Sequence, residues 1–303
     1  MGEQSEARRS ILAVPAGRPE MMSKAQSLGA DQIFFDLEDG TAPSVREAAR
    51  ENIANAINGR SRGYITSMVS IRINRVGSSD FEADMKLLSN GTAKGIDSII
   101  LPKVNSLKDL GFVDSQLSAI ETALSIVPGS IVIDAQIESA KGLVSANEIA
   151  AYPRVASLSF GPLDFLADLG VPTLGINEIP TELISHALAK ILIAARAAGK
   201  LAFDGPCVDY KNVDVFERSA KTAYAMGFDG KWLIHPNQIE ACHSIFTPTS
   251  SEFEMALKTL ADYSHAITVG IGAIESGGVM IDAASIRMAL VIKARGVAAG
   301  MLA

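Results

Sequence analysis

Cysteine is scarce in this sequence: the 303 residues contain only Cys207 and Cys242, which are too far apart to form a CxxC motif. Two distant cysteines leave no thiolate zinc motif and fit a chain kept in a reducing compartment. An excess of positive charge is also missing, because 27 Lys and Arg stand against 34 Asp and Glu and give a net charge of -7. The sequence therefore has no basic footprint for nucleic acid or for an anionic membrane surface.

Long hydrophobic runs are missing as well. No apolar stretch approaches the roughly 20 residues that a membrane-spanning helix needs. The N-terminal stretch MGEQSEARRS is polar and lacks the hydrophobic region of a secretory signal. We therefore expect a cytoplasmic protein. With 48% hydrophobic and 20% charged residues, the composition is that of a globular enzyme with one large domain or two smaller ones.

Short β-rich apolar runs alternate along the chain with longer, Ala-rich segments of helical spacing. The strand candidates are residues 10–15, 32–38, 68–74, 98–103, 131–138, 156–161, 201–206 and 231–236. Helix candidates between them include 44–57, 106–124 and 182–199. Eight β-then-α units predict a (β/α)8 TIM barrel. A doubly wound sheet is the alternative, but it more often has fewer strands and a Gly-rich first turn, which this sequence lacks.

The alternation of strand-like and helix-like segments ends after residue 246. Residues 247–270 predict a turn and a helix, and residues 271–296 predict a Gly-rich connection, a short apolar piece and a final helix. We therefore expect a TIM-barrel catalytic domain over residues 1–246 and a C-terminal helical extension over residues 247–303. Gly277 and Gly278 are the expected hinge of this extension.

Ionisable residues fall at the predicted strand ends, where TIM barrels build their active sites. They are Asp36, Glu38, Arg72, Lys103, Glu138, Asp164, Asp204 and His235. A set of carboxylates with one His and no Cys favours Mg²⁺ or Mn²⁺ over zinc. Glu138 and Asp164 follow consecutive strands and are the natural pair of ligands for that ion.

Plainer interpretations stay open for each candidate. Glu138 or Asp164 could cap a helix, or pair with Lys141 or Arg72. His235 stands before a proline and could simply hydrogen-bond the backbone. Lys103 could form a Schiff base or pair with a carboxylate. The sequence contains no GxSxG or HExxH motif, and VGIGAIESGG does not have the GxGxxG spacing.

Eight blocks of the sequence together resemble a known family. They are RRSILAVPAGRPEMMSKA, DLEDGTAPSVREAAR, SIRIN, ILPKV, IESAKG, GPLDFLADLG, GKWLIHPNQI and MIDAASIRMA, in that order. They resemble the citrate lyase beta subunit and malyl-CoA lyase group of the HpcH/HpaI aldolase superfamily, from about residue 9 to 290. The block GKW-x-IHP-x-Q and the tail block VMIDAASI look closest to the malyl-CoA lyases.

The resemblance implies a Mg²⁺-dependent carbon–carbon lyase on a TIM barrel that assembles as homotrimers or dimers of trimers. Such an enzyme cleaves a 3-hydroxyacyl-CoA of the malyl, methylmalyl or citramalyl type into an acyl-CoA and a small 2-oxo acid. By position, Glu138 and Asp164 match the metal-binding pair and Arg72 matches the substrate-binding arginine. The positions that match CoA contacts are Arg18, Lys24, Ile234 and His235.

The resemblance also gives the C-terminal extension a role. Asp282 matches the acid/base carboxylate, which the tail of a neighbouring subunit delivers like a lid. Asp36, Glu38 and Asp39 would then orient Arg72, Lys103 or water at the metal, with direct metal ligation as the alternative.

Other activities remain open at this point. The chain could be a metal-dependent aldolase acting on free hydroxy-keto acids, or a malyl-CoA thioesterase. It could also be a catalytically silent barrel that serves as an interaction subunit. The segment after Asp164 is short, as in the smaller citrate-lyase-like members, so the acyl-CoA and the 2-oxo acid stay unassigned.

Overall fold

The computed structural model describes residues 7–58, 68–172, 181–268, 272–276 and 279–302. The chain divides into two compact units, one from Arg8 to Cys242 and one that contains the described residues from His243 onward. Gly277 and Gly278, the expected hinge, lie outside the described residues. Among the described residues, no helix is both long enough and apolar enough to cross a membrane.

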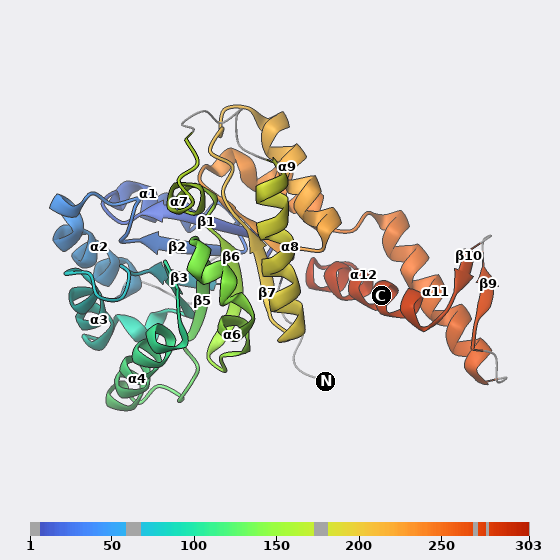
Figure 1. Cartoon of the computed structure of the whole chain (residues 1–303), viewed down its shortest axis with the longest axis horizontal. Coiled ribbons are helices and arrows are strands. Elements are labelled where there is room, and N and C mark those ends of the chain that lie inside the picture. Colours follow the sequence, from blue (N-terminus) through green and yellow to red (C-terminus); the bar gives the residue numbers. More distant parts are fainter. Residues whose placement is uncertain (1–6, 59–67, 173–180, 269–271, 277–278, 303) are drawn as a thin grey trace. The chain divides into compact units, whose positions relative to one another are not determined.

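The first unit is a closed barrel of eight parallel strands in sequence order, because β1 pairs with both β2 and β8 (Figure 1). The strands are β1 (Ser10–Pro15), β2 (Gln32–Asp36), β3 (Met68–Arg72), β4 (Ser98–Leu101), β5 (Val132–Ile137), β6 (Val155–Phe160), β7 (Leu201–Asp204) and β8 (Gly230–Leu233). The predicted TIM barrel is confirmed, and the doubly wound alternative is wrong.

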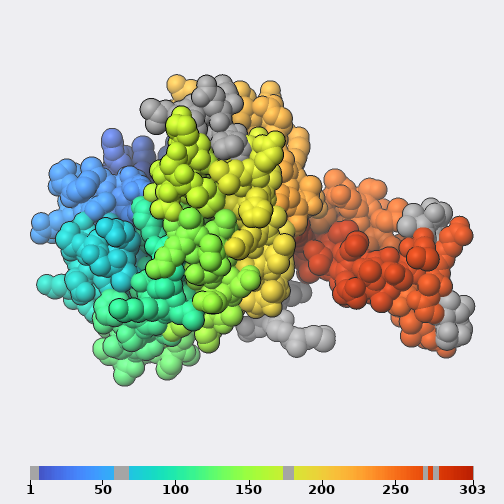
Figure 2. All heavy atoms as spheres, viewed as in Figure 1, coloured from blue at the N-terminus to red at the C-terminus, as the bar shows by residue number. Residues whose placement is uncertain are grey.

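Helices follow the strands and cover the outside of the barrel. They are α1 (Pro19–Ala25), α2 (Arg46–Asn58), α3 (Phe81–Ser89), α4 (Leu107–Leu124), α5 (Ala140–Val144), α6 (Ala146–Ala151), α7 (Pro162–Asp168), α8 (Thr181–Ala197), α9 (Val213–Met226) and α10 (Ile239–Phe246). Short 3-10 turns add Pro43–Val45, Thr92–Gly95 and Pro236–Gln238. Helices α6 and α8 pack on each other and against β6, and their atoms close over that side of the barrel in the space-filling view (Figure 2).

Local sequence sets several of these boundaries. The Ser106 hydroxyl accepts a hydrogen bond from the Asp109 backbone N–H at 3.4 Å and so caps α4. The Ser139 hydroxyl caps α5 in the same way, through the Gly142 N–H at 2.9 Å. Helix α9 ends at Gly227, whose φ of 109° suits glycine and lets the chain turn back toward β8.

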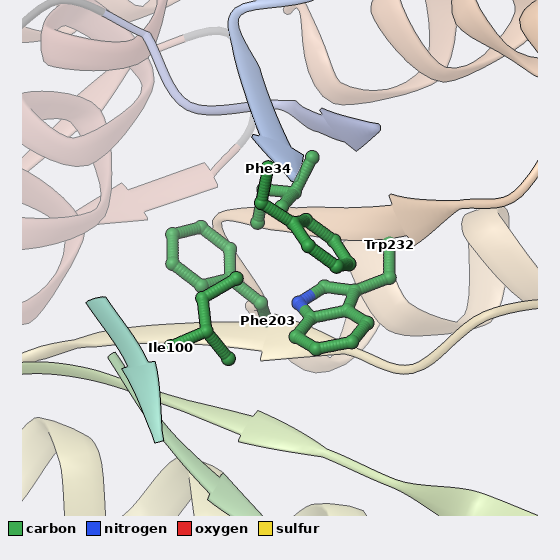
Figure 3. Packing of buried hydrophobic residues seen from close by; sticks show 5 residues of the cluster. Phe34, Ile100, Phe203 and Trp232 are labelled. Atoms are coloured by element: carbon green, nitrogen blue, oxygen red, sulfur yellow. The ribbon is translucent and has the colours of Figure 1, made fainter. Parts of the chain in front are cut away.

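The middle of the barrel is apolar. Strand β2 is buried along its whole length, which explains its run of apolar residues. Phe34 of β2 packs there with Ile11, Ile100, Phe203 and Trp232 (Figure 3). The Phe34 and Trp232 ring centroids are 4.7 Å apart at an interplanar angle of 50°. This aromatic layer forms an apolar floor beneath the carboxyl ends of the strands.

A polar layer lies below the aromatic one, and Asp134 of β5 is its centre. Its carboxylate accepts hydrogen bonds from Arg8 at 2.8 Å, Ser98 at 2.7 Å and Ser157 at 2.5 Å. Burial opposes the ionisation of Asp134, but Arg8 and the two hydroxyls outweigh burial and lower the pKa of this carboxyl. The lower end of the barrel is therefore closed by a polar network whose central charge is compensated.

The second unit contains two helices and a hairpin. Helix α11 (Ser250–Thr268) and helix α12 (Ala283–Ala298) pack against each other. Between them β9 (Ile274–Ser276) and β10 (Val279–Ile281) form an antiparallel pair. The predicted helices are confirmed, whereas the residues expected to be a Gly-rich connection and an apolar piece include these two paired strands.

Replacement of Asp134 by Ala should destabilise the protein by about 3–5 kcal/mol, because it leaves the buried Arg8 guanidinium and several donors without their acceptor. Urea unfolding would measure the loss, with Glu51→Ala on the exposed side of α2 as the matched control. A loss below about 1 kcal/mol would show that the lower polar layer does not support the barrel.

Candidate active site

The carboxylates that follow the apolar stretch Ile33–Phe35 have defined partners. Asp36, the last residue of β2, lies opposite Arg72, the last residue of β3. Its Oδ1 accepts from Arg72 Nε at 2.8 Å and its Oδ2 accepts from Nη2 at 2.6 Å. The backbone N–H groups of Glu38 and Gly40 also donate to this carboxylate, at 2.9 and 2.8 Å. Asp36 is therefore well satisfied, and its clear function in the structure is to orient Arg72.

Arg72 is held tightly on one edge of its guanidinium and makes longer contacts with the other. The Asp36 carboxylate holds Nε and Nη2, whereas Nη1 lies 3.4 Å from Glu38 Oε2 and 3.5 Å from Gln136 Oε1. The guanidinium also lies over the Trp232 ring, with its carbon 5.6 Å from the centroid. Burial opposes this charge, but Asp36 and Glu38 outweigh burial and raise the pKa of Arg72. Nη1 thus makes only two long contacts, and the guanidinium is a fixed cation that can also attract a further anionic group.

Lys103 lies among carboxylates at the end of β4. Its Nζ is 2.5 Å from Glu38 Oε1, 3.3 Å from Asp164 Oδ1 and 3.7 Å from Asp39 Oδ2. Burial opposes the ammonium, but the hydrogen bond to Glu38 and the nearby charges raise the pKa of Lys103. A lysine nucleophile needs the neutral amine, so this setting argues against a Schiff base and favours the carboxylate-paired alternative.

Glu138, directly after β5, is the carboxylate with an open position. Its side chain is buried, and its Oε1 accepts a hydrogen bond from the Lys103 backbone N–H at 2.7 Å. Its Oε2 is buried and has no hydrogen-bond partner among the described residues. Burial and the neighbouring carboxylates of Asp164 and Glu38 raise the pKa of Glu138 to about 8. A buried oxygen without a donor is the place where a cation would be stabilised.

Gly161, which follows β6, makes room for that oxygen. A Cβ at this position would lie 2.4 Å from Glu138 Oε2 and 2.9 Å from Gln136 Nε2. Glycine is therefore needed here for close approach rather than for an unusual backbone conformation. Gly161 also precedes α7, whose first turn carries Asp164 with a side chain that is 39% exposed.

Glu138 and Asp164 open onto a pocket of about 370 Å³ at the carboxyl ends of the strands. Its other polar lining residues include Arg75, Asn105 and Ser139. The described residues contain no cluster of three or more His, Cys, Asp and Glu that would enclose a metal by themselves. Two carboxylates, one with a free oxygen, instead fit Mg²⁺, which typically takes one or two protein carboxylates and completes its shell with water and substrate oxygens.

The candidate CoA positions lie on exposed parts of the barrel unit. Arg18 precedes α1 and Lys24 lies on it, and both side chains are exposed to solvent. Ile234 and His235 follow β8, and Ile234 is 39% exposed. His235 Nδ1 accepts from the Asn237 backbone N–H at 3.2 Å, as its plainer interpretation proposed. Its ring also stacks on Tyr210 at a centroid distance of 5.1 Å.

Two sequence candidates are not among the residues that line this pocket. Asp204 of β7 is paired with the buried Lys231 of β8, which also donates to the Gly205 carbonyl at 2.7 Å. Asp282 belongs to the second unit and begins α12, where its Oδ1 accepts from the Ala284 and Ser285 N–H groups at 2.9 and 3.0 Å. These backbone hydrogen bonds lower the pKa of Asp282. Its carboxylate is thus ionised at neutral pH.

Several site residues were not predicted from the sequence. Gln136 was missed, although it precedes Glu138 by two residues and so shares its face of β5. Ser159 of β6 is buried, and its hydroxyl has no hydrogen-bond partner among the described residues. Gly161 appeared only as the first residue of the block GPLDFLADLG and was given no function of its own. Strand alternation would have found Gln136 and Ser159, but the need for Gly161 depends on how closely β5 and β6 approach.

The protein is thus a TIM barrel with a carboxylate-rich site at the carboxyl ends of its strands, and one buried carboxylate oxygen of that site has no partner among the described residues. A model of the HpcH/HpaI aldolase/citrate lyase family matches residues 9–236. The chain belongs to this family.

Three curated relatives are similar over most of their length. An L-malyl-CoA/beta-methylmalyl-CoA lyase of Cereibacter sphaeroides is 34% identical over 298 residues, covering 94% of this chain and 93% of the relative. The citrate lyase subunit beta of Haemophilus influenzae is 34% identical and covers 95% and 96%. A (3S)-malyl-CoA thioesterase of Cereibacter sphaeroides is 32% identical and covers 93% and 92%.

A similar solved structure is that of protein CitE from Mycobacterium tuberculosis in complex with magnesium, acetoacetate and coenzyme A. It is 28% identical, has a TM-score of 0.76, and the match covers 96% of this chain and 98% of that one.

Without metal, Glu138 should make the protein less stable as the pH rises. The folded-state pKa of about 8 lies above the ordinary glutamate value of 4.5, so between these pH values the folded state holds a proton that the unfolded state has lost. The contribution of Glu138 to the free energy of unfolding is complete below pH 4.5 and is lost as the pH rises through about 8. The Glu138→Gln variant cannot ionise at this position. Between pH 4.5 and about 8, its free energy of unfolding should therefore rise relative to that of wild type by about 1 kcal/mol per pH unit.

Urea unfolding in EDTA at pH 5 and pH 8 would measure the difference between the two proteins. A gap of the same size at both pH values would contradict the raised pKa of Glu138.

Proposed function

We propose that this protein is a Mg²⁺-dependent carbon–carbon lyase that reversibly cleaves a 3-hydroxyacyl-CoA of the malyl type into an acyl-CoA and a small 2-oxo acid. The observation that carries the proposal is Glu138: its free, buried Oε2 faces the position of Gly161, next to Asp164 and the fixed Arg72. Relatives named as malyl-CoA lyase and citrate lyase subunit beta support the reaction class.

Glu138 and Asp164 would hold the divalent ion. When bound, Mg²⁺ supplies Lewis-acid polarisation of the substrate's hydroxyl or oxo oxygen. Asp36 and Glu38 take no part in ligation on this proposal, because both are already engaged by Arg72 and Lys103. Asp39, with a side chain 56% exposed and 3.7 Å from Lys103, adds to the negative field at the mouth.

Arg72 would bind the carboxylate of the 2-oxo acid half. Its Asp36-held edge fixes the guanidinium plane, and Nη1, which makes only longer contacts to Glu38 and Gln136, would be shared with the substrate carboxylate. A cation already in place, over an apolar floor, can balance charge that develops during cleavage without first reorganising. The same group would orient the oxo acid for the condensation direction.

The CoA part of the substrate would lie across the loops after β1 and β8. Arg18 and Lys24 offer two exposed cations for its phosphates, with Arg18 held only loosely by Glu20 at 3.8 Å. Ile234 and His235 would contribute an apolar surface and a ring, respectively.

Asp282 would exchange a proton with the α-carbon of the acyl-CoA, as general base in the condensation direction. Its lowered pKa keeps it in the ionised form that a general base requires. We assign it to the site of a neighbouring subunit, so the second unit acts as a lid in a homotrimer or dimer of trimers. Exposed apolar side chains of that unit, Met280 and Met288, support an assembly surface, since they are 69% and 67% exposed.

The purified protein should condense an acyl-CoA with a 2-oxo acid in a Mg²⁺-dependent manner. Acetyl-CoA or propionyl-CoA would be offered with glyoxylate or pyruvate, and the products identified by mass spectrometry with an EDTA control. We expect a malyl-, methylmalyl- or citramalyl-CoA product that EDTA abolishes. Arg18→Ala and Lys24→Ala should raise KM for the acyl-CoA with little change in kcat, because they lose phosphate contacts.

The same assay separates the alternatives. Malyl-CoA would be offered as a further substrate. If it released free CoA and no 2-oxo acid were formed, the result would favour a thioesterase, the activity named for one relative. Unchanged CoA thioesters together with turnover of a free hydroxy-keto acid would favour the metal-dependent aldolase. No turnover of either class would contradict the proposal.

Mixed subunits should restore activity if Asp282 works across an interface. Asp282→Asn and Glu138→Ala are each expected to be inactive, but a mixed oligomer can join an intact barrel to an intact tail. In an equal mixture that exchanges freely, about one quarter of the sites should be intact.

The control for this rescue is Asp282→Asn mixed with the Asp282→Asn, Glu138→Ala double variant, which has no intact tail to supply. No rescue after mass spectrometry has confirmed subunit exchange would overturn the shared site.

A further inference from the structure

Lys103 has a backbone conformation that is unusual for its side chain. Its φ is 52°, and Lys103 and Ser125 are the two described non-glycine residues with positive φ. A side chain at such an angle costs about 1 kcal/mol, so the surrounding structure must hold it there. In this conformation the Lys103 backbone N–H donates to Glu138 Oε1 at 2.7 Å. One oxygen of Glu138 is thereby fixed by the main chain, and the other is left open.

The side chain of the same residue reaches the second carboxylate. Lys103 Nζ lies 2.5 Å from Glu38 Oε1 and 3.3 Å from Asp164 Oδ1. The ammonium thus lies against Asp164, which together with Glu138 would bind the metal. Of the two contacts, the one to Asp164 is the longer, and its partner is the more exposed carboxylate.

We propose that Lys103 is a positioning residue that both shapes the cation site and competes for it. Its left-handed main chain orients Glu138, and its ammonium contacts both Glu38 and Asp164 until a divalent cation displaces it from Asp164 and leaves it paired with Glu38 alone. The inference rests on the metal-binding part of the proposed function, not on the lyase reaction.

A lysine used in this way acts as a resident counter-cation. While no divalent ion is bound, its positive charge lies between Asp164 and Glu38 and reduces the electrostatic repulsion between their carboxylates. The divalent ion must then outcompete a tethered single charge. Removal of that charge should weaken the metal-free protein and strengthen metal binding at the same time.

Lys103→Met tests the ammonium. It keeps a side chain of similar length and the backbone N–H, but it removes the charge. By isothermal titration with Mn²⁺, its Kd should fall at least about tenfold, because a unit positive charge a few ångströms from the ion is gone. Its Tm in EDTA should fall, and the rise in Tm on adding Mn²⁺ should exceed that of wild type.

Lys141→Met is the matched control. Lys141 is an exposed lysine of α5, which follows the same strand as Glu138, and its side chain makes no described contact with Glu138 or Asp164. Its Mn²⁺ Kd should stay within about twofold of wild type, since exposed charges are screened. An equal gain from both variants would overturn the specific role of Lys103, as would unchanged or weaker binding by Lys103→Met.

A second pair of variants tests the main chain. Lys103→Gly and Lys103→Ala both lack the ammonium, but only glycine adopts a positive φ without cost. The Gly variant should melt about 2 °C above the Ala variant, the reverse of the usual order of these residues. A more stable Ala variant would overturn the left-handed positioning of Glu138.

The outcomes also separate this inference from the lyase proposal. If wild type failed to bind Mn²⁺ in the titration, both would be overturned. If Lys103→Met bound Mn²⁺ more tightly while the condensation assay gave no product, the role of Lys103 would stand and only the lyase assignment would fail.

Discussion

The two-pronged ion pair between Asp36 and Arg72 is the interaction on which the rest of the site depends. It allows a guanidinium to stay buried at the barrel mouth, and that guanidinium in turn lies within 3.4 Å of Glu38. Lys103 completes the neutralisation of Glu38. Arg72 and Lys103 therefore balance Asp36 and Glu38, and Glu138 and Asp164 are left as the pair that a cation would neutralise once Glu138 has lost its proton. A divalent cation would cancel that remainder, which explains why an acidic cluster can persist at the end of a core strand.

The two polar layers of the barrel differ in how completely they are satisfied. Below the aromatic floor, Asp134 has a guanidinium and two hydroxyls as donors, so that end is closed. Above the floor, Glu138 Oε2 and Ser159 Oγ are buried without partners among the described residues. Incomplete hydrogen bonding costs stability, and here it is confined to the end where TIM barrels bind ligands. Stability and function are thus assigned to opposite ends of the same strands.

The sequence was sufficient for the barrel because each strand carries its own pattern. The ranges 10–15 and 32–38 differ from β1 and β2 by two residues at most, since apolar runs and turn residues mark strand ends locally. The site was harder to predict. Asp204 was grouped with the mouth residues, yet it is paired with Lys231, because a strand-end position does not say which face a side chain takes. The β9–β10 pairing and the positive φ of Lys103 also escaped prediction, since both depend on contacts between segments rather than on local pattern.

Asp282, the proposed base, differs from Glu138 in what sets its charge. Its pKa is lowered by N–H groups of its own helix, those of Ser285 and Ala284. The charge of the proposed base is therefore set within its own unit. The barrel has the opposite arrangement, because the pKa of Glu138 depends on Asp164, Glu38, Arg72 and Lys103 together. A base whose charge is fixed locally can be supplied by a separate unit, whereas a metal site built from mutually dependent charges must stay on the rigid strands.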